Sequence, residues 1–144
     1  MIRIKNFLLL SITIIILCIS IAALSSPLRP VLVGNKLVFV EFARTRAEQS
    51  FGLKNRQELG KDRGMLFIFP VERFLKFWMK DTLIPLSIVF IDRNRTIIDI
   101  QHMLPRQTAI IYTSKKKAKY ALEMNVHWFE NNDVNIGDKV RFWR

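Results

Sequence analysis

Several residue types that define whole classes of protein are scarce in this chain. It has one cysteine, two histidines, five glycines and five prolines in 144 residues. A single cysteine excludes a disulfide scaffold and any zinc site built from several thiolates. The few glycines and prolines exclude collagen-like and low-complexity chains. With 50% hydrophobic residues, the chain is too apolar to be disordered, and its length allows one ordinary domain.

The N-terminal segment, residues 1–26, has the pattern of an export signal. Arg3 and Lys5 precede residues 7–24, a stretch without any charged side chain. As a hydrophobic helix this stretch would be roughly 27 Å long, just short of a typical bilayer core. The small residues Ala23 and Ser25 suit signal peptidase, so a cleaved signal peptide and an N-terminal membrane anchor both remain open. Either one predicts a domain outside the cytoplasm: periplasmic, or anchored in the inner membrane through residues 7–24.

The rest of the chain is predicted to be a linker, residues 27–35, followed by one β-rich domain, residues 36–144. Apolar runs between turn residues predict short strands. The expected strands are 36–43, 64–69, 77–79, 86–92, 96–101, 109–112, 119–124 and 139–143. Thr45 and Glu48 have the spacing of a capping box, which predicts a helix of about two turns ending near Leu53. The fold class is therefore mainly β, a compact sandwich or partly closed barrel with one short α-helix, preceded by the N-terminal hydrophobic helix.

Several blocks in the middle of the chain are more specific than a generic β-domain requires. They are Gly52–Arg56, Gly64–Phe69, Phe77–Thr82, Ile84–Leu86, Phe90–Asp92, Ala121–Glu123 and Gly137–Asp138. In this order and spacing the chain resembles DUF192, a bacterial and archaeal domain of unknown function, over about residues 38–140. The resemblance implies a small, mostly β fold, often behind a signal peptide, and no established activity.

The chain departs from the DUF192 pattern at three places. Lys54 stands where the family usually has Met, and Ser87 where it usually has Asp. A glycine common after the Leu-Glu block is absent, since residues 125–128 read Asn-Val-His-Trp. If the carboxylate were a metal ligand or a base in the family, Ser87 could not replace it.

Four residues are candidates for a ligand-binding site: Arg56, Trp78, Thr82 and Glu123. A guanidinium matches the geometry of a carboxylate or phosphate, so Arg56 is either a ligand anchor or one half of an internal ion pair. Glu123 lies between apolar neighbours and faces either a cavity or solvent. Trp78 belongs either to a pocket wall or to a packed core, and Thr82 either to a pocket or to a turn.

We predict no catalytic residues, no metal site and no cofactor. His102 and His127 are 25 positions apart without a thiol partner, and the methionines are too widely spaced for a copper site. No nucleophile motif surrounds Ser87 or Ser114. His102 has the chemistry of a base, but nothing in the sequence links it to a serine.

The excess of basic residues indicates anionic partners. The chain has 23 basic and 12 acidic residues, a net charge of +11, of which Arg3 and Lys5 contribute two. Outside the cytoplasm such a domain meets anionic envelope components, and we expect no nucleic-acid partner. The sequence favours a non-catalytic module that binds a small ligand or an envelope component. The alternative is an envelope hydrolase that uses Glu123 with Asp92 or His102.

Overall fold

The computed structural model describes residues 27–143. The predicted hydrophobic helix within residues 1–26 lies outside the described residues, as does Cys18. Within residues 27–143 no helix has the length and hydrophobicity needed to cross a membrane.

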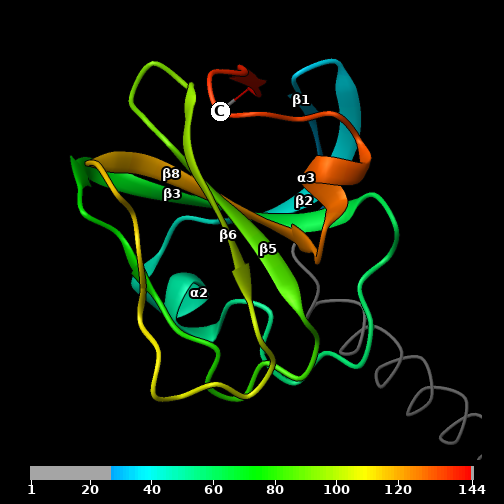
Figure 1. Cartoon of the computed structure of the whole chain (residues 1–144), viewed down its shortest axis with the longest axis vertical. Helices are drawn as coiled ribbons and strands as arrows, with labels where there is room; N and C mark the ends of the chain where they lie inside the picture. The colour runs from blue at the N-terminus through cyan, green and yellow to red at the C-terminus, as the bar shows by residue number, and fades with distance from the viewer. Residues whose placement is uncertain (1–26, 144) are drawn as a thin grey trace, which may run out of the picture.

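A seven-stranded sheet forms most of the domain (Figure 1). Its strand order is β6-β5-β8-β3-β2-β1-β9, and a small second sheet pairs β4 with β7. The strands are β1 (Arg29–Val33), β2 (Lys36–Ala43), β3 (Arg63–Arg73), β4 (Lys76–Phe77), β5 (Leu86–Ile91), β6 (Ile97–Met103), β7 (Tyr112–Thr113), β8 (Ala118–Asn125) and β9 (Val140–Arg141). Neighbours in the large sheet run antiparallel, except that β2 and β3 are parallel.

The large sheet curls until its two edges approach each other. Thr96, just before edge strand β6, forms an isolated antiparallel bridge with Lys139, just before edge strand β9. Backbone amides of Ile97 and Val140 donate to the carbonyls of Asp138 and Arg95 beside this bridge. The result is a half-barrel closed at one end, which resolves the predicted choice between a sandwich and a partly closed barrel.

The two faces of the curled sheet carry two separate cores. The concave face carries the inner core, to which all the larger strands contribute; among its members are Val31, Val40, Leu66, Val89, Leu122 and Phe129. The opposite face carries the outer core, which is covered by loops and the small sheet; among its members are Leu53, Phe67, Leu75, Ile88, Phe90 and Ala121. Adjacent residues of one strand, such as Ala121 and Leu122, enter different cores because side chains alternate along a strand.

The helix α2 (Arg46–Phe51) begins at the predicted capping box. The Thr45 hydroxyl accepts a hydrogen bond from the Glu48 amide at 3.2 Å, and the Glu48 carboxylate accepts one from the Thr45 amide at 2.8 Å. The backbone hydrogen bond from Thr45, followed by that from Arg44, holds the pKa of Glu48 below its ordinary value. The capping box therefore fixes the residue at which the helix begins, in the connection between the parallel strands β2 and β3.

The fold differs from the sequence-based prediction in several places. The predicted strands 77–79, 109–112 and 139–143 are shorter or shifted and appear as β4, β7 and β9, and β3 continues past Pro70 to Arg73.

Two further differences concern whole elements. Residues 29–33 are not linker: they form β1, which pairs with β2 along its whole length and also with β9. Pro30 is the second residue of β1 and does not prevent the strand from forming. A second helix, α3 (Trp128–Asn131), was not predicted; it buries Trp128 and Phe129 in the inner core. In Figure 1, α2 and α3 lie on opposite sides of the sheet.

Candidate functional site

Glu123 lies on the outer face of the sheet, in the middle of an apolar row. Strand pairing places Met65 of β3 on one side of it and Ile88 of β5 on the other. Glu123 is 5% exposed, and its carboxyl group forms no hydrogen bond or ion pair with any residue of the described chain. Burial raises the pKa of the Glu123 carboxyl to about 8 from an ordinary value of 4.5. At neutral pH the group is therefore mostly a neutral acid, able to donate a hydrogen bond.

A cavity of 250 Å³ opens above Glu123. Its aromatic wall residues come from the end of α2, from β3, and from β4 with the residue that follows it: Phe51, Phe67, Phe69, Phe77 and Trp78. Phe77 packs edge-on against Phe67 at 4.9 Å between ring centroids, which fixes that wall. Its polar side chains include Gln49, Ser50 and Thr82. The cavity size is just below the range of about 300–1,000 Å³ typical of ligand pockets, so an occupant would be small.

Positive charge surrounds the cavity. Lys54, Arg73 and Lys76 line it, and none of them pairs with a carboxylate within residues 27–143. The Lys54 ammonium lies 5.8 Å from the centroid of the Trp78 ring, and Lys80 lies 5.6 Å from the same centroid. Glu123 is the one acidic residue among the lining side chains of this cavity. The site therefore combines a cationic rim, aromatic walls and a buried acid.

Three of the four predicted site residues, Trp78, Thr82 and Glu123, line this one cavity. Trp78 is 48% exposed and belongs to the rim rather than to a packed core. Thr82 is buried, and its hydroxyl has no hydrogen-bond partner in the described chain. Sequence alone did not assign the cationic role to Lys54, Arg73 and Lys76, which are brought together only by the fold.

Arg56 does not line the cavity. It forms the internal ion pair that the sequence left open: its two terminal nitrogens meet the two oxygens of Glu41 at 2.6 and 2.8 Å. Glu41 of β2 pairs with Met65, which in turn pairs with Glu123. Glu41 and Glu123 thus lie in one row, two strands apart, and the arginine satisfies only the first. Arg56 fastens the segment after α2 to the sheet.

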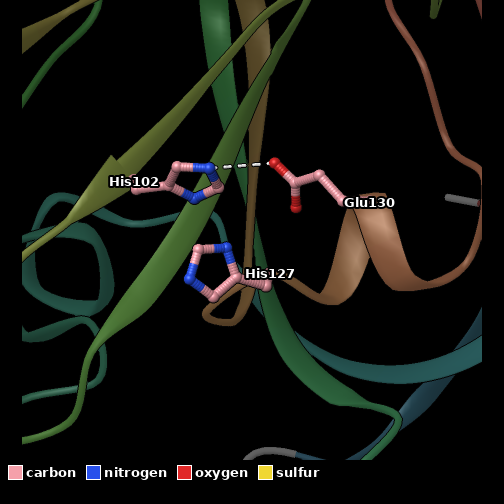
Figure 2. A group of neighbouring side chains, drawn as sticks. All are labelled: His102, His127 and Glu130. Carbon is pink, nitrogen blue, oxygen red and sulfur yellow. Dashed lines mark ion pairs between the residues drawn. The ribbon is translucent and has the colours of Figure 1, made fainter.

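A second polar group lies on the other side of the same strands (Figure 2). His102 of β6 sits opposite Ser87 of β5, with the Ser87 Oγ 2.8 Å from its Nδ1. Its Nε2 lies 2.9 Å from Oε1 of Glu130 in α3. The His127 ring lies 4.6 Å from the His102 ring between centroids. Ligand atoms of His102, His127 and Glu130 all lie within 4.8 Å of one another.

The series Ser87–His102–Glu130 has the residue types of a hydrolytic triad but not its accessibility. The Ser87 side chain is 0% exposed, and its oxygen already accepts the His127 amide at 2.9 Å. A nucleophile must reach the substrate, so this serine is a structural hydrogen-bonding group. Ser114 is likewise engaged, with Leu75 and Lys116.

The structure does not assemble the alternative hydrolase site. Ser87, Met124 and His102 share one row, and Met124 belongs to the inner core, whereas Glu123 faces the outer core. His102 and Glu123 therefore project from opposite faces of the sheet. Asp92 lies four residues beyond Ile88, about 13 Å along the strand from the Glu123 position. Its carboxylate accepts the Thr96 amide in the β5–β6 turn.

Fold and cavity together define a small curled-sheet protein with an acid-floored, basic-rimmed pocket. The chain belongs to the DUF192 family: the family model, described as an uncharacterised ACR, matches residues 31–142. A UPF0127 protein of Pyrococcus abyssi (strain GE5 / Orsay) is 32% identical over 108 residues, covering 72% of this chain and 85% of that protein.

Two solved structures share the fold. A candidate transcription regulator from Sinorhizobium meliloti 1021 is 30% identical, with a TM-score of 0.78 over 83% of this chain and 96% of that one. A protein of unknown function from Novosphingobium aromaticivorans DSM 12444 is 32% identical, with a TM-score of 0.76 over 80% of this chain and 85% of that one. These comparisons define family and fold and assign no activity.

The histidine group was missed by sequence reasoning. No sequence pattern points to Glu130, and the 25-residue gap between the histidines is not a metal-ligand spacing. One signal was present: Ser87 and the stretch 125–128, two of the departures from the family pattern, lie together here, since Ser87 Oγ contacts both His102 and the His127 amide.

Proposed function

We propose that this protein binds a small organic anion with an aromatic or apolar body in the cavity above Glu123. The observation that carries the proposal is a buried carboxyl group that has no partner among residues 27–143, at the floor of a cavity whose rim is cationic. An unpaired buried polar group is costly to a fold, and such groups cluster where a ligand is bound.

The charge of the rim favours an anion. Lys54, Arg73 and Lys76 have no acidic partner in the described chain, so a ligand carboxylate or phosphate would supply the missing counter-charge. The aromatic walls favour a flat or apolar body beneath that group. The anchor is therefore this rim and not Arg56, which does not line the cavity and whose two terminal nitrogens contact Glu41.

The acid at the floor selects a hydrogen-bond acceptor. While neutral, Glu123 donates a hydrogen bond from its O–H to an ether, carbonyl or hydroxyl oxygen of the ligand. Once ionised, its carboxylate would repel the negative charge of the ligand. We therefore expect anion binding to weaken as pH rises through about 8, the pKa to which burial raises this carboxyl.

Export of the domain is part of the same proposal. It is supported by the uncharged stretch 7–24 behind Arg3 and Lys5, and by the absence of cysteine after residue 26. An anionic ligand would then come from the cell envelope or from outside the cell. We propose binding without catalysis, because neither candidate partner lies beside Glu123: His102 projects from the opposite face of the sheet, and Asp92 lies further along its strand.

Calorimetric titration of the full-length protein in detergent tests the proposal with three probes of similar size. Benzoate and phenyl phosphate carry an anion on an aromatic ring, and benzyl alcohol carries none. We expect both anions to bind, benzyl alcohol to bind much more weakly, and added salt to weaken the anions.

A charge-matched pair of variants localises the binding. Lys54→Ala with Lys76→Ala removes two rim cations, and Lys36→Ala with Lys61→Ala removes two cations outside the cavity. Only the first pair is expected to lose benzoate binding. Equal affinity for all three probes, or equal loss in both double variants, would refute the proposal.

A further inference from the structure

We propose that His102, His127 and Glu130 form a binding site for a divalent transition-metal ion, with Zn²⁺ the ion that this donor set suits. This site is separate from the cavity above Glu123 and does not depend on the function proposed there. Two imidazoles and one carboxylate are an established zinc ligand set. In Figure 2 the three side chains converge from β6 and from the segment around α3.

A left-handed residue and the strand register bring the three ligands together. His127 adopts a left-handed conformation, φ 61°, which turns the chain out of β8 and into α3. Its carbonyl then accepts the Asn131 amide at 3.0 Å, so His127 and Glu130 lie about one turn apart on the same side. His102 lies on the edge strand, where its register partner is Ser87. The Ser87 hydroxyl oxygen accepts a hydrogen bond from the His127 amide, and this places His102 beside the other two ligands.

Ser87 can serve His102 both with and without a metal. Its oxygen accepts the His127 amide, and its hydroxyl proton is available to the Nδ1 of His102. A metal-bound imidazole instead donates its second ring N–H to a neighbour. A hydroxyl oxygen has two lone pairs, so Ser87 can accept that N–H beside the amide. The ring is thus held with Nε2 directed toward Glu130 in either state.

The ligand atoms are close to coordination distance. Zinc–nitrogen bonds of about 2.0–2.1 Å place neighbouring ligand atoms of a tetrahedral site roughly 3.3 Å apart. His102 Nε2 and Glu130 Oε1 are 2.9 Å apart, and the most distant pair in the group lies within 4.8 Å. The side chains of His102 and Glu130 are 43% and 46% exposed, so small rotations can complete the geometry without repacking a core.

The same exposure leaves the ion accessible. Three protein ligands leave at least one position for water or an external ligand, the arrangement of an open zinc site rather than a closed structural one. These are also the only two histidines of the chain, so imidazole-dependent binding can arise nowhere else in the protein.

Zinc titration of the chelator-stripped, full-length protein tests the site, with Co²⁺ as the optical probe. A Cys18→Ser background removes the single thiol, which lies outside the described residues. We expect one Zn²⁺ per chain, and visible absorption from Co²⁺ that added Zn²⁺ abolishes.

Three variants decide whether these side chains are the ligands. His127→Asn keeps a residue that tolerates the left-handed backbone, and it should lower zinc affinity by more than about 100-fold. Glu130→Gln should also lower zinc affinity strongly, whereas Glu58→Gln, an exposed carboxylate elsewhere, should not. The unfolding temperature without metal shows that each variant is folded. The site is rejected if the parent protein binds no zinc, or if folded His127→Asn and Glu130→Gln bind as tightly as the parent.

Discussion

Two ionisable sites lie on opposite faces of the same strands and differ in almost every physical respect. On the outer face, Glu123 is buried among apolar side chains and has no partner in the described chain. On the other side, His102 and Glu130 are half exposed and joined to each other, and Ser87 holds the ring. Burial without a partner changes the protonation state of a group, whereas exposure with partners keeps several donor atoms together and available.

A second contrast lies within the outer face itself. Glu41 and Glu123 occupy the same row, separated by Met65, and both are nearly buried. Glu41 receives two short contacts from Arg56, while burial alone acts on the pKa of Glu123 and raises it. The fold thus satisfies one carboxylate and leaves its neighbour open toward a cavity.

The largest expected effect is the pH dependence that Glu123 imposes on stability. With the pKa near 8 in the folded state and 4.5 as the ordinary value, the folded protein holds this proton more tightly. Stability is then fully present below about pH 4.5 and is lost as pH rises to about 8, by roughly 3 to 5 kcal/mol. Glu123→Gln should abolish this contribution. Urea-induced unfolding from pH 4 to pH 9 measures the difference from the parent protein.

The control for this series is Glu58→Gln, which changes an exposed carboxylate. Its difference from the parent should stay flat across the pH range. If Glu123→Gln also gave a flat difference, the carboxyl would be an ordinary one, and the contrast between the two faces would disappear.

Removing the partner of Glu41 should have the next largest effect. Arg56→Ala leaves a nearly buried carboxylate without its arginine, and we expect a loss of about 1–3 kcal/mol in unfolding free energy. Because Arg56 does not line the cavity, benzoate affinity of the folded variant should equal that of the parent.

Arg56→Ala combined with Glu41→Gln is the matched variant, since it removes the stranded charge as well. It should recover part of the lost stability. A loss of benzoate binding in folded Arg56→Ala would instead make this arginine a ligand anchor.

The smallest expected effect concerns a single rim cation. Lys54→Ala removes an ammonium that lies 5.8 Å from the Trp78 ring centroid at the mouth of the cavity. Exposed charges contribute little each, so benzoate affinity should fall by about 0.5–1 kcal/mol, a few-fold in Kd. Stability should not change. Titration at low and high salt should show the difference only at low salt; a difference that persisted at high salt would contradict a purely electrostatic role.

Sequence patterns predicted those elements whose signals are local. The capping box placed the start of α2, and the apolar runs placed β2, β5 and β8 to within two residues. The strand β1 was missed because Arg29 and Pro30 suggested a linker, while its pairing with β2 and β9 depends on distant residues. The four-residue helix α3 has no capping side chain from which it could have been predicted.

The same difference between local signals and long-range contacts decides which residues of the candidate sites could be predicted. A charged residue inside an apolar strand singled out Glu123 before the fold was known. The charge rim of Lys54, Arg73 and Lys76, and the meeting of His102 with His127 and Glu130, arise from sheet register and crossover geometry. No spacing in the sequence encodes such contacts, so only the structure could supply them.

The protonation state of Glu123 tests the central claim most directly. Full-length protein labelled with ¹³C at the glutamate side-chain carboxyl, with Glu123→Gln to assign the resonance, gives its titration curve. We predict a midpoint near pH 8, the pKa to which burial raises this group. A midpoint near the ordinary value of 4.5 would mean that the carboxyl is ionised and solvated at neutral pH, and it would contradict the neutral acid at the floor of the cavity.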